Sequence, residues 1–534
     1  MSRAGKKKWF KKWHKWPALI LSVFILLFSL SGIVLNHRSF FSGADVSRRL
    51  IPETYRYKNW NLAAVRGGLS WKPDSLLVYG NIGIWLIDSN LTKFKDFNQG
   101  FPEGIDKRKI SSLAKTADGG LYAGTLFGLY RYVPEAGSWQ EVSLPVDEKR
   151  VVKVLFSGGT LWVMTRSYLM RSVGAGLPRF EMVHIGAPPG DDGRVSLFRT
   201  LWVIHSGEIY GMAGRLLVDF IGFVFIFLTL TGLVYFVTPY TVKNLSAKLK
   251  SRWKRFNRWS LRWHNITGSW LILLLILTAA TGIFLRPPLL IAIGDSRIGK
   301  IPFSVLANPN PWQDKLRDLV YDDSSRHFML ATSEGIFRID PEFRGSPEYF
   351  SFQPPVSVMG INVFEPLDEG SWLIGSFSGL YRWNPQTRIL RDHVNGAVVD
   401  AAALSGSPFG GLAVAGYLQT PSGTEVVFDY GKGAMFRNTK GGISSEFPSM
   451  PSEIIEKSPM SLWNLALEFH TCRIYGVWIG DFYILLIPLF GLGILFILVT
   501  GFFSWYYGRK KKRAAAAMTV RKQASIYAEA EVTH

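Results

Sequence analysis

Two histidines at the start of apolar segments are followed by the same landmark. Trp13-His14 and Trp263-His264 each open such a segment. A Ser/Thr-Gly pair, Ser31-Gly32 or Thr281-Gly282, follows, so that His and Gly are 18 residues apart in both copies. Ionisable side chains that enter apolar helices are costly and usually functional, and the glycines let helices approach closely or leave space for a flat macrocycle. The repeat predicts that His14 and His264 bind a metal or haem together.

A second pair of histidines precedes two other apolar segments. His205 and His470 each begin the pattern His-x-x-x-Ile-Tyr-Gly. On a straight helix, the ten residues from His205 to Arg215 would place this histidine about 15 Å outside the apolar run. We therefore expect a bend at Gly211 or Gly214 to fold it back. With that bend, His205 and His470 form the second predicted ligand pair.

His37 is the alternative ligand for the second site. It lies 23 residues after His14, which is about 35 Å along a helix and enough to cross an apolar core about 30 Å thick. The equivalent position in the other half of the chain is Pro287, so His37 has no duplicate. We hold His37 in reserve behind His205 and His470.

The cofactor expected at these sites is haem b, in two copies. An axial imidazole donates one ring nitrogen to iron while its other nitrogen makes a hydrogen bond. The chain contains one cysteine, Cys472, and no Cys-x-x-Cys-His, so a haem would be held by axial ligands and packing, without thioether bonds. The histidines lack Cys, Asp or Glu partners at the spacing of zinc sites. No catalytic residue is assigned.

The net charge of +21 is concentrated beside the apolar segments. Residues 1–16, 240–263 and 508–522 contain 7, 8 and 7 Lys and Arg residues, and the remaining basic residues nearly balance the 40 acidic ones. Because basic residues flank membrane helices on the cytoplasmic side, we expect a bacterial inner-membrane protein with both termini cytoplasmic and two long periplasmic loops. This distribution indicates membrane lipid as a partner and argues against nucleic acid.

The expected fold class is membrane α + β, with four transmembrane helices from an internal duplication and an all-β periplasmic propeller-like domain built from two long loops. The predicted division along the chain is a basic cytoplasmic start (1–16), a first transmembrane helix (17–37), a β segment of three blades (38–196), a pre-membrane segment with the second helix (197–239), a basic cytoplasmic loop (240–263), the third helix (264–286), a second β segment of three blades (287–460), a pre-membrane segment with the fourth helix (461–507) and a basic cytoplasmic tail (508–534).

The two long segments contain a repeat of their own. Alternating apolar runs flank short turns near Gly83, Gly128 and Tyr168 in the first segment, and near Gly335, Gly379 and Gly433 in the second. Tight turns between alternating runs indicate hairpins, and a period of about 40 to 50 residues is typical of propeller blades. Because blades bury their faces against one another, we expect one propeller-like domain of about six blades, with two separate β-sandwich domains as the alternative.

The strings around the histidines resemble the PepSY-associated transmembrane helix family. They are KWHKWPALIL with LSGIVLNH, RWHNITGSWLILL with ATGIF, IHSGEIYGMAGRL, and FHTCRIYG, and together they cover a minor part of the chain. The sequence departs from the family pattern at Cys472, where the first half has Gly207. It also departs in the distance from His470 to Gly501, which is four residues longer than that from His205 to Gly232.

The resemblance implies an inner-membrane haem protein of the ferric-siderophore reductase type, an oxidoreductase that passes electrons to a ferric siderophore or other iron chelate in the periplasm. Quinol and a cytoplasmic reductase both remain open as the electron donor. The main alternative is a membrane-anchored propeller sensor or protein-binding module without redox activity, in which the histidines are interfacial anchors. A haem or copper handling protein is a third possibility.

Overall fold

The computed structural model describes residues 2–73, 75–88, 93–174, 178–355, 360–400, 411–420, 424–437, 443–444 and 448–532. The chain forms two compact units, and each unit takes segments from both halves of the sequence. The helical unit contains residues 1–38, 194–307 and 463–534, and the β unit contains residues 39–193 and 308–462.

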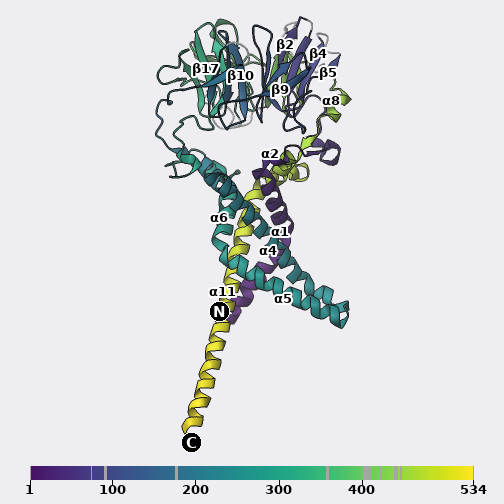
Figure 1. Ribbon diagram of the computed structural model, residues 1–534, viewed down its shortest axis with the longest axis vertical. Coiled ribbons are helices and arrows are strands. Elements are labelled where there is room, and N and C mark those ends of the chain that lie inside the picture. Colours follow the sequence, from purple (N-terminus) through teal and green to yellow (C-terminus); the bar gives the residue numbers. More distant parts are fainter. Residues whose placement is uncertain are drawn as a thin grey trace. The chain divides into compact units, whose positions relative to one another are not determined.

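The helical unit is a bundle in which α1 packs against α4 and α11, α6 packs against α11, and α5 packs against α4 (Figure 1). Its elements are α1 (Arg3–Asn36), β14 (Val195–Ser196), α3 (Leu197–Ser206), η3 (Glu208–Tyr210), α4 (Gly211–Thr241), η4 (Val242–Asn244), α5 (Ala247–Trp270), α6 (Ile272–Ile283), α7 (Leu289–Ile293), β15 (Arg297–Ile298), η5 (Val305–Ala307), α9 (Leu462–His470), η7 (Arg473–Tyr475), α10 (Gly476–Ile479), η8 (Gly480–Leu485) and α11 (Leu486–Val532).

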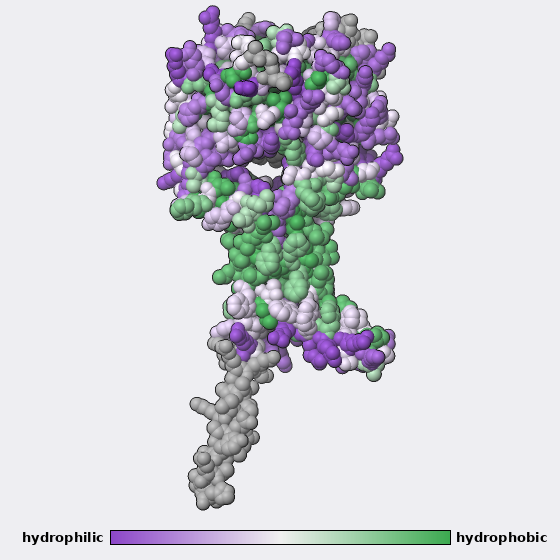
Figure 2. Space-filling model, viewed as in Figure 1, coloured by the Kyte–Doolittle hydropathy of each residue, from purple (hydrophilic) through white to green (hydrophobic). Residues whose placement is uncertain are grey.

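Three helical segments of the described chain are long and apolar enough to cross a membrane: Ala4–Asn36, Glu208–Asn244 and Arg473–Arg509. The count becomes four if α5 and α6, which meet at an angle of 67°, form one broken span. Hydrophobic residues cover the middle of the helical unit, whereas hydrophilic residues predominate on the β unit (Figure 2). The chain is therefore a membrane protein with an apolar helical part and a separate β-rich part.

The segment expected to be one helix over 264–286 is instead two helices. The first, α5, begins at Ala247, and the helical path breaks at Leu271 before α6. Gly268 and Ser269 lie three and two residues before the break, and a Gly/Ser pair is a common cause of a sharp kink. α5 carries seven Lys or Arg residues, whereas α6 carries none, so only α6 has the composition of a helix inside a bilayer.

A bend before α4 folds His205 back, as the sequence predicts. Gly207, which caps the end of α3, has φ +78°, and Gly211 at the start of α4 has φ +60°. Both values lie in the left-handed region that glycine adopts without strain. The bend thus uses Gly211, one of the two expected glycines, together with Gly207. Gly214 lies inside α4, where a Cβ atom would be 2.0 Å from the carbonyl oxygen of Gly207.

The β unit consists mainly of six antiparallel sheets, each made of four strands that are consecutive in the sequence. The strands are β2 (Gly67–Lys72), β3 (Ser75–Gly80), β4 (Gly83–Asp88) and β5 (Phe94–Asp96); β6 (Ile110–Lys115), β7 (Leu121–Thr125), β8 (Leu129–Val133) and β9 (Ser138–Val142); β10 (Val151–Ser157), β11 (Thr160–Thr165), β12 (Leu169–Val173) and β13 (Arg179–Val183); β16 (Leu316–Asp322), β17 (His327–Thr332), β18 (Gly335–Ile339) and β19 (Glu348–Tyr349); β20 (Val363–Pro366), β21 (Trp372–Ser376), β22 (Gly379–Asn384) and β23 (Ile389–Asp392); β24 (Val414–Gln419), β25 (Glu425–Asp429), β26 (Gly433–Arg437) and β27 (Ile443–Ser444).

Short elements complete the β unit. They are β1 (Asp45–Val46), which pairs with β28 (Met460–Ser461), and the helical turns α2 (Arg38–Phe41), η1 (Arg48–Leu50), η2 (Glu53–Tyr55), η6 (Asp368–Gly370) and α8 (Ser452–Glu456). Each of the six hairpins expected from the sequence is formed by the two central strands of one sheet. The first is β3–β4 and the last is β25–β26.

The six sheets follow one another in a circuit of packing contacts. The first strand of each sheet contacts the first strand of the next, and β24 of the last sheet contacts β2 of the first. Each neighbouring pair of sheets also shares a cluster of buried hydrophobic residues. Neither three-sheet segment is a separate sandwich, because two of the six clusters join a sheet from one segment to a sheet from the other.

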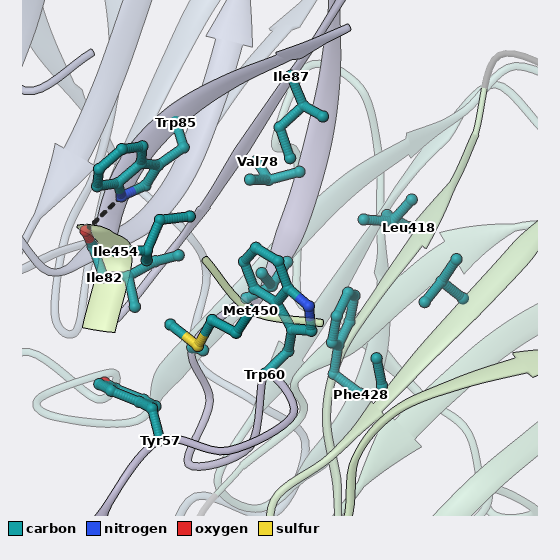
Figure 3. Packing of buried hydrophobic residues seen from close by; sticks show 14 of the residues in the cluster. Tyr57, Trp60, Val78, Ile82, Trp85, Ile87, Leu418, Phe428, Met450 and Ile454 are labelled. Carbon is teal, nitrogen blue, oxygen red and sulfur yellow. Dashed lines mark hydrogen bonds between the residues drawn. The ribbon is translucent and has the colours of Figure 1, made fainter. Parts of the chain in front are cut away.

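The junction between the first and last sheets is closed by aromatic packing and backbone hydrogen bonds. Trp60 and Phe428 are fully buried there, beside Val78 of β3 and Leu418 of β24 (Figure 3). The Trp60 indole Nε1 donates to the carbonyl oxygen of Pro448 at 2.8 Å. The amide nitrogens of Leu62, Ala434 and Tyr417 donate to the carbonyl oxygens of Tyr430, Asn59 and Arg66, respectively, which binds the start of the first sheet to the last.

Candidate cofactor-binding site

His14 of α1 and His264 of α5 form the first histidine pair. Their ring centroids are 6.1 Å apart and their planes are inclined by 69°. The Nδ1 atom of His14 lies 2.9 Å from the carbonyl oxygen of Ile497, and Nδ1 of His264 lies 2.9 Å from the hydroxyl of Thr231. Because that hydroxyl donates its own proton to Phe227, it accepts from the imidazole. Both Nδ1 atoms are therefore N–H donors.

His205 of α3 and His470 of α9 form the second histidine pair, with the same centroid distance of 6.1 Å and an inclination of 55°. Nδ1 of His205 is 3.0 Å from the carbonyl oxygen of Thr278, and Nδ1 of His470 is 3.1 Å from that of Phe28. A carbonyl only accepts hydrogen bonds, so Nδ1 carries the proton in both rings. Nε2 is then the nitrogen with a free lone pair, which is the form that binds a metal.

Each of the four imidazoles lies against a glycine of a Ser/Thr-Gly pair. A Cβ atom would lie 2.8 Å from Cε1 of His14 at Gly501, 3.6 Å from Cε1 of His264 at Gly232, 2.8 Å from Cε1 of His205 at Gly282, and 3.3 Å from Cε1 of His470 at Gly32. From the sequence, Gly32 and Gly282 are expected to allow close helix approach or to leave space for a macrocycle. In the structure these two glycines contact imidazoles of the second pair, and Gly232 and Gly501 do the same for the first.

The glycines also explain which backbone carbonyl accepts the hydrogen bond from each imidazole. In an α-helix the carbonyl of residue i bonds the amide of residue i+4. Phe28, Thr278 and Ile497 each lie four residues before one of the glycines, and Leu228, whose backbone bonds His264, lies four residues before Gly232. A missing side chain at i+4 leaves the carbonyl open to a second donor. The Ser/Thr-Gly pair is thus the point on a helix where the edge of an imidazole packs and donates its hydrogen bond.

Every one of these contacts joins the two halves of the duplicated sequence. His14 and His205 from the first half contact α11 and α6 of the second half, while His264 and His470 contact α4 and α1 of the first. Neither half holds a complete histidine pair alone. The duplication therefore produces two sites only because the halves interlock.

The two histidine pairs lie at different levels of the bundle. α1 is one continuous helix that carries His14 of the first pair and, 18 residues later, Gly32 beside His470 of the second pair. At a rise of about 1.5 Å per residue, these two points are about 27 Å apart. A bilayer core is about 30 Å thick, so this separation is close to the thickness of one.

The distances within the pairs fit a metal bound between two imidazoles. A metal between two imidazoles, with metal–nitrogen bonds of about 2 Å, places the ring centroids about 6 Å apart, close to the 6.1 Å in both pairs. No group of three or more His, Cys, Asp or Glu side chains in the described residues could hold a bare metal ion. Each pair by itself offers a metal two imidazole ligands.

His37, the reserve ligand, belongs to neither pair. Its Nε2 lies 2.6 Å from Oδ2 of Asp219, and the amide of Asn36 donates to Oδ1 of the same carboxylate at 2.9 Å. Asp219 is buried in α4. A buried carboxylate with two polar partners is satisfied, so this group connects α1 to α4 and leaves the second site to His205 and His470.

Polar residues that the sequence analysis did not predict lie beside the second pair. Arg473 donates to the carboxylate of Glu468. Burial and then the charge of Arg473 lower the pKa of Arg286, and burial raises the pKa of Cys472 to about 12. These contacts come from residues that are distant in sequence, and only Cys472 stood out in the pattern because Gly207 occupies the equivalent place.

Comparisons with known proteins connect the chain to a membrane family. The profile of the PepSY-associated TM region matches residues 1–238 and 132–507. No curated protein sequence matches the chain. The extracellular domain of a hybrid two-component system from B. thetaiotaomicron is 11% identical, with a TM-score of 0.35, and the match covers 69% of this chain and 32% of that one.

A second solved structure is similar at the same level. PorZ, a surface component of the type-IX secretion system of Porphyromonas gingivalis, is 11% identical, with a TM-score of 0.33, and the match covers 70% of this chain and 38% of that one. The chain thus spans about a third of the length of these two solved structures.

Proposed function

Because the chain belongs to the PepSY-associated TM region family, we propose that it is a bacterial inner-membrane electron-transfer protein that reduces a ferric siderophore or other iron chelate in the periplasm. It holds two haem b groups, one between His14 and His264 and the other between His205 and His470. The observation that carries this proposal is the matched geometry of the two pairs. The ring centroids are 6.1 Å apart in both pairs, and Nδ1 donates a hydrogen bond to a backbone carbonyl in His14, His205 and His470.

The side chains of the bundle have defined roles in this proposal. The four imidazoles bind through Nε2, and the carbonyl and hydroxyl acceptors fix their orientation and raise their basicity. A bound haem would supply reversible one-electron chemistry between its ferric and ferrous states. With two histidines as its protein ligands, a bound haem would have no position left for substrate at iron, so the sites would suit electron transfer. The apolar helices around them keep water away.

The topology of the proposal follows from charge. Lys and Arg residues cluster in 1–16, 240–263 and 508–522, and the positive-inside rule then places both termini in the cytoplasm and the β unit in the periplasm. The β unit is a six-bladed propeller in this proposal, supported by six consecutive four-stranded sheets whose first strands contact one another in a circuit. It offers a docking surface for the iron chelate. Electrons enter from quinol or from a cytoplasmic reductase.

Haem content and reoxidation test the proposal. The purified chain, expressed with haem supply, should contain two haems and show a b-type spectrum when reduced. His14→Ala or His264→Ala should remove the haem of the first pair, and His205→Ala or His470→Ala that of the second, whereas His184→Ala in the β unit should keep both. Mixing the reduced protein with a ferric chelate without oxygen should reoxidise it.

A colourless protein, even after haemin is added, would refute the haem assignment and favour the sensor or protein-binding module instead. If the protein contains two haems but ferric chelates do not reoxidise it, the cofactor assignment stands and the reductase activity is refuted. The protein would then be a haem-handling protein. The two results therefore separate the cofactor from the reaction.

A further inference from the structure

The first strands of the six sheets surround the centre of the β unit, because each contacts the first strand of the next in a closed circuit. Three consecutive first strands carry a charged side chain: Lys153 on β10, Asp318 on β16 and Glu365 on β20. Nζ of Lys153 lies 2.7 Å from Oδ1 of Asp318. An ion pair therefore joins two neighbouring first strands, and charge is concentrated around the centre of the circuit.

Tyr79 extends towards this centre from the first sheet. It lies on β3 opposite Gly67 of β2, and a Cβ atom at Gly67 would be 2.5 Å from the hydroxyl oxygen of Tyr79. Because Gly67 carries no side chain, the phenol can extend across the first strand. Burial raises the pKa of Tyr79, and the charges of Glu365 and Asp318 raise it further. The phenol therefore faces the first strands of the fourth and fifth sheets.

Water reaches these side chains although protein surrounds them. Four of them keep part of their surface accessible: Arg66, which directly precedes β2, Tyr79, Asp318 and Glu365. Burial nevertheless lowers the pKa of Arg66 and raises the pKa of both Asp318 and Glu365, and it is the largest effect on each. A side chain that protein encloses and that solvent still touches lines a narrow recess. This central recess is open to a small molecule.

Arg66 is the cationic end of the central recess. Its amide donates to the carbonyl oxygen of Tyr79 at 2.7 Å, and its own carbonyl accepts from the amide of Tyr417 at 3.2 Å, so its backbone is fixed between two sheets. Its guanidinium makes no hydrogen bond or ion pair within the part of the chain that the structure describes. An enclosed charge is normally paired, and a carboxylate can accept two parallel hydrogen bonds from a guanidinium. Arg66 therefore suits a carboxylate ligand.

Glu365 is the acidic end of the central recess. Its carboxylate makes no hydrogen bond with another described residue, and the charges of Lys153 and Asp318 act on it. Because Lys153 is already paired with Asp318, one negative charge is left over here, which an ammonium group would balance. The charges of Arg66 and Glu365 both act on Tyr79, so the phenol lies between the two ends.

We propose that the central recess binds a small zwitterion, such as an amino acid or a short peptide. The carboxylate of the ligand meets the guanidinium of Arg66, its ammonium group meets Glu365, and the hydroxyl of Tyr79 lies beside the atoms between them. A ligand with only one charge leaves the other end of the recess without a partner, and this difference gives the selectivity. The site goes beyond the proposed electron-transfer function and needs no haem.

Isothermal titration calorimetry of the full chain in detergent tests this proposal. The three probes have the same chain length and differ in charge: ε-aminocaproate is a zwitterion, caproate an anion and hexylamine a cation. We expect ε-aminocaproate to bind roughly tenfold more tightly than either of the others, because each end of the recess adds a hydrogen bond to a charged group. Equal affinity for the three probes, or no binding of ε-aminocaproate, would overturn the proposal without any substitution.

Two substitutions separate the ends of the recess. Arg66→Gln should lower the affinity for ε-aminocaproate roughly tenfold without lowering that for hexylamine. Glu365→Gln should lower the affinity for ε-aminocaproate to a similar extent without lowering that for caproate. Thermal unfolding checks that both variants are folded.

Arg382→Gln is the matched control, because Arg382 is exposed on β22, the third strand of its sheet. It removes one positive charge from the β unit and should leave the affinity for all three probes unchanged. An equal loss of ε-aminocaproate binding in Arg66→Gln and Arg382→Gln would overturn the proposal in favour of diffuse attraction. Weaker binding of hexylamine in a folded Arg66→Gln variant would overturn the assignment of the two ends.

Discussion

Gly282 and His205 are in such close contact that a Cβ atom on the glycine would lie 2.8 Å from Cε1 of the imidazole. Gly501 has the same relationship to His14, also at 2.8 Å. Contacts this short leave no space for a methyl group unless the imidazole moves. The half of the chain that receives each histidine must therefore carry glycine at the point of contact.

Gly282→Ala should displace His205 and impair the second site. We expect the haem content to fall from two towards one per chain, with a destabilisation of about 1 to 3 kcal/mol from overpacking. Gly222→Ala in α4 is the control, because its Cβ would lie 3.4 Å from the side chain of Ile33, an ordinary contact. Spectra and thermal unfolding of both variants measure the difference, and equal haem content in the two would contradict the proposed role of Gly282.

Thr231→Val should change the first site without removing its ligands. The hydroxyl of Thr231 accepts a hydrogen bond from His264 Nδ1 at 2.9 Å. Loss of such a partner typically lowers metal affinity by about 10- to 100-fold. A less basic imidazole stabilises ferric iron less, so we expect a higher midpoint potential or weaker haem retention at the first site, measured by redox titration.

Thr229→Val is the matched control for this change. Thr229 lies on the same helix and its hydroxyl bonds only the carbonyl oxygen of Phe225, at 2.8 Å, among the described contacts. Both substitutions replace one hydroxyl by one methyl group. Identical potentials in Thr231→Val and Thr229→Val would show that the hydroxyl does not tune His264.

The histidine pairs could be predicted from the sequence because their signal is a repeated residue type at a repeated spacing. The spacing of His14 and His264 from their glycines put both at equivalent places, and the structure brings the two rings together. The hairpins were equally visible, because alternation and turn residues are local properties. The glycine that faces each histidine could not be identified from the sequence, because its identity depends on how the two halves interlock.

Other features were hidden for related reasons. The break at Leu271 depends on the Gly268-Ser269 pair and on the charge of α5, which outweigh the apolar run that follows. The partner of His37 is Asp219, more than 180 residues away, and no spacing rule connects them. Long-range pairing of single residues leaves no periodic signal in one sequence.

His37→Gln should leave both haems in place, because the partner of His37 is Asp219 and not one of the four paired histidines. The substitution should instead lower the free energy of unfolding. Loss of one partner of a buried hydrogen-bonded group costs about 1 to 3 kcal/mol, and Asp219→Asn should lower the melting temperature to a similar extent. If haem content fell by one in His37→Gln while the fold persisted, His37 would be a ligand.

Cys472 should resist thiol reagents in the folded protein. Its side chain is fully buried, and burial raises its pKa to about 12, so at pH 8 it is a neutral thiol and the reactive thiolate is scarce. Maleimide should label the chain only after denaturation, when the pKa returns to about 8.5. Mass spectrometry detects the adduct, and rapid labelling of the native protein would contradict the buried position.

Cys472→Gly is the unlabelled control and tests the backbone at this position. Cys472 has φ +58°, in the left-handed region, and its counterpart Gly207 has φ +78°. A residue other than glycine in this region costs about 1 to 2 kcal/mol. We therefore expect the variant to fold with unchanged or higher stability.

Trp60→Ala should open the junction between the first and last sheets of the β unit. Trp60 is fully buried and holds Pro448 through its indole N–H, and truncation of a buried tryptophan costs about 3 to 5 kcal/mol. Trp71→Ala should cost less, because Trp71 is a partly exposed residue of β2 that packs against the cluster shared by the first and second sheets. Limited proteolysis and thermal unfolding compare the two. The segment around Trp60 is hydrogen-bonded to the last sheet. If Trp60→Ala lost no more stability than Trp71→Ala, the circuit of sheets would not depend on this junction.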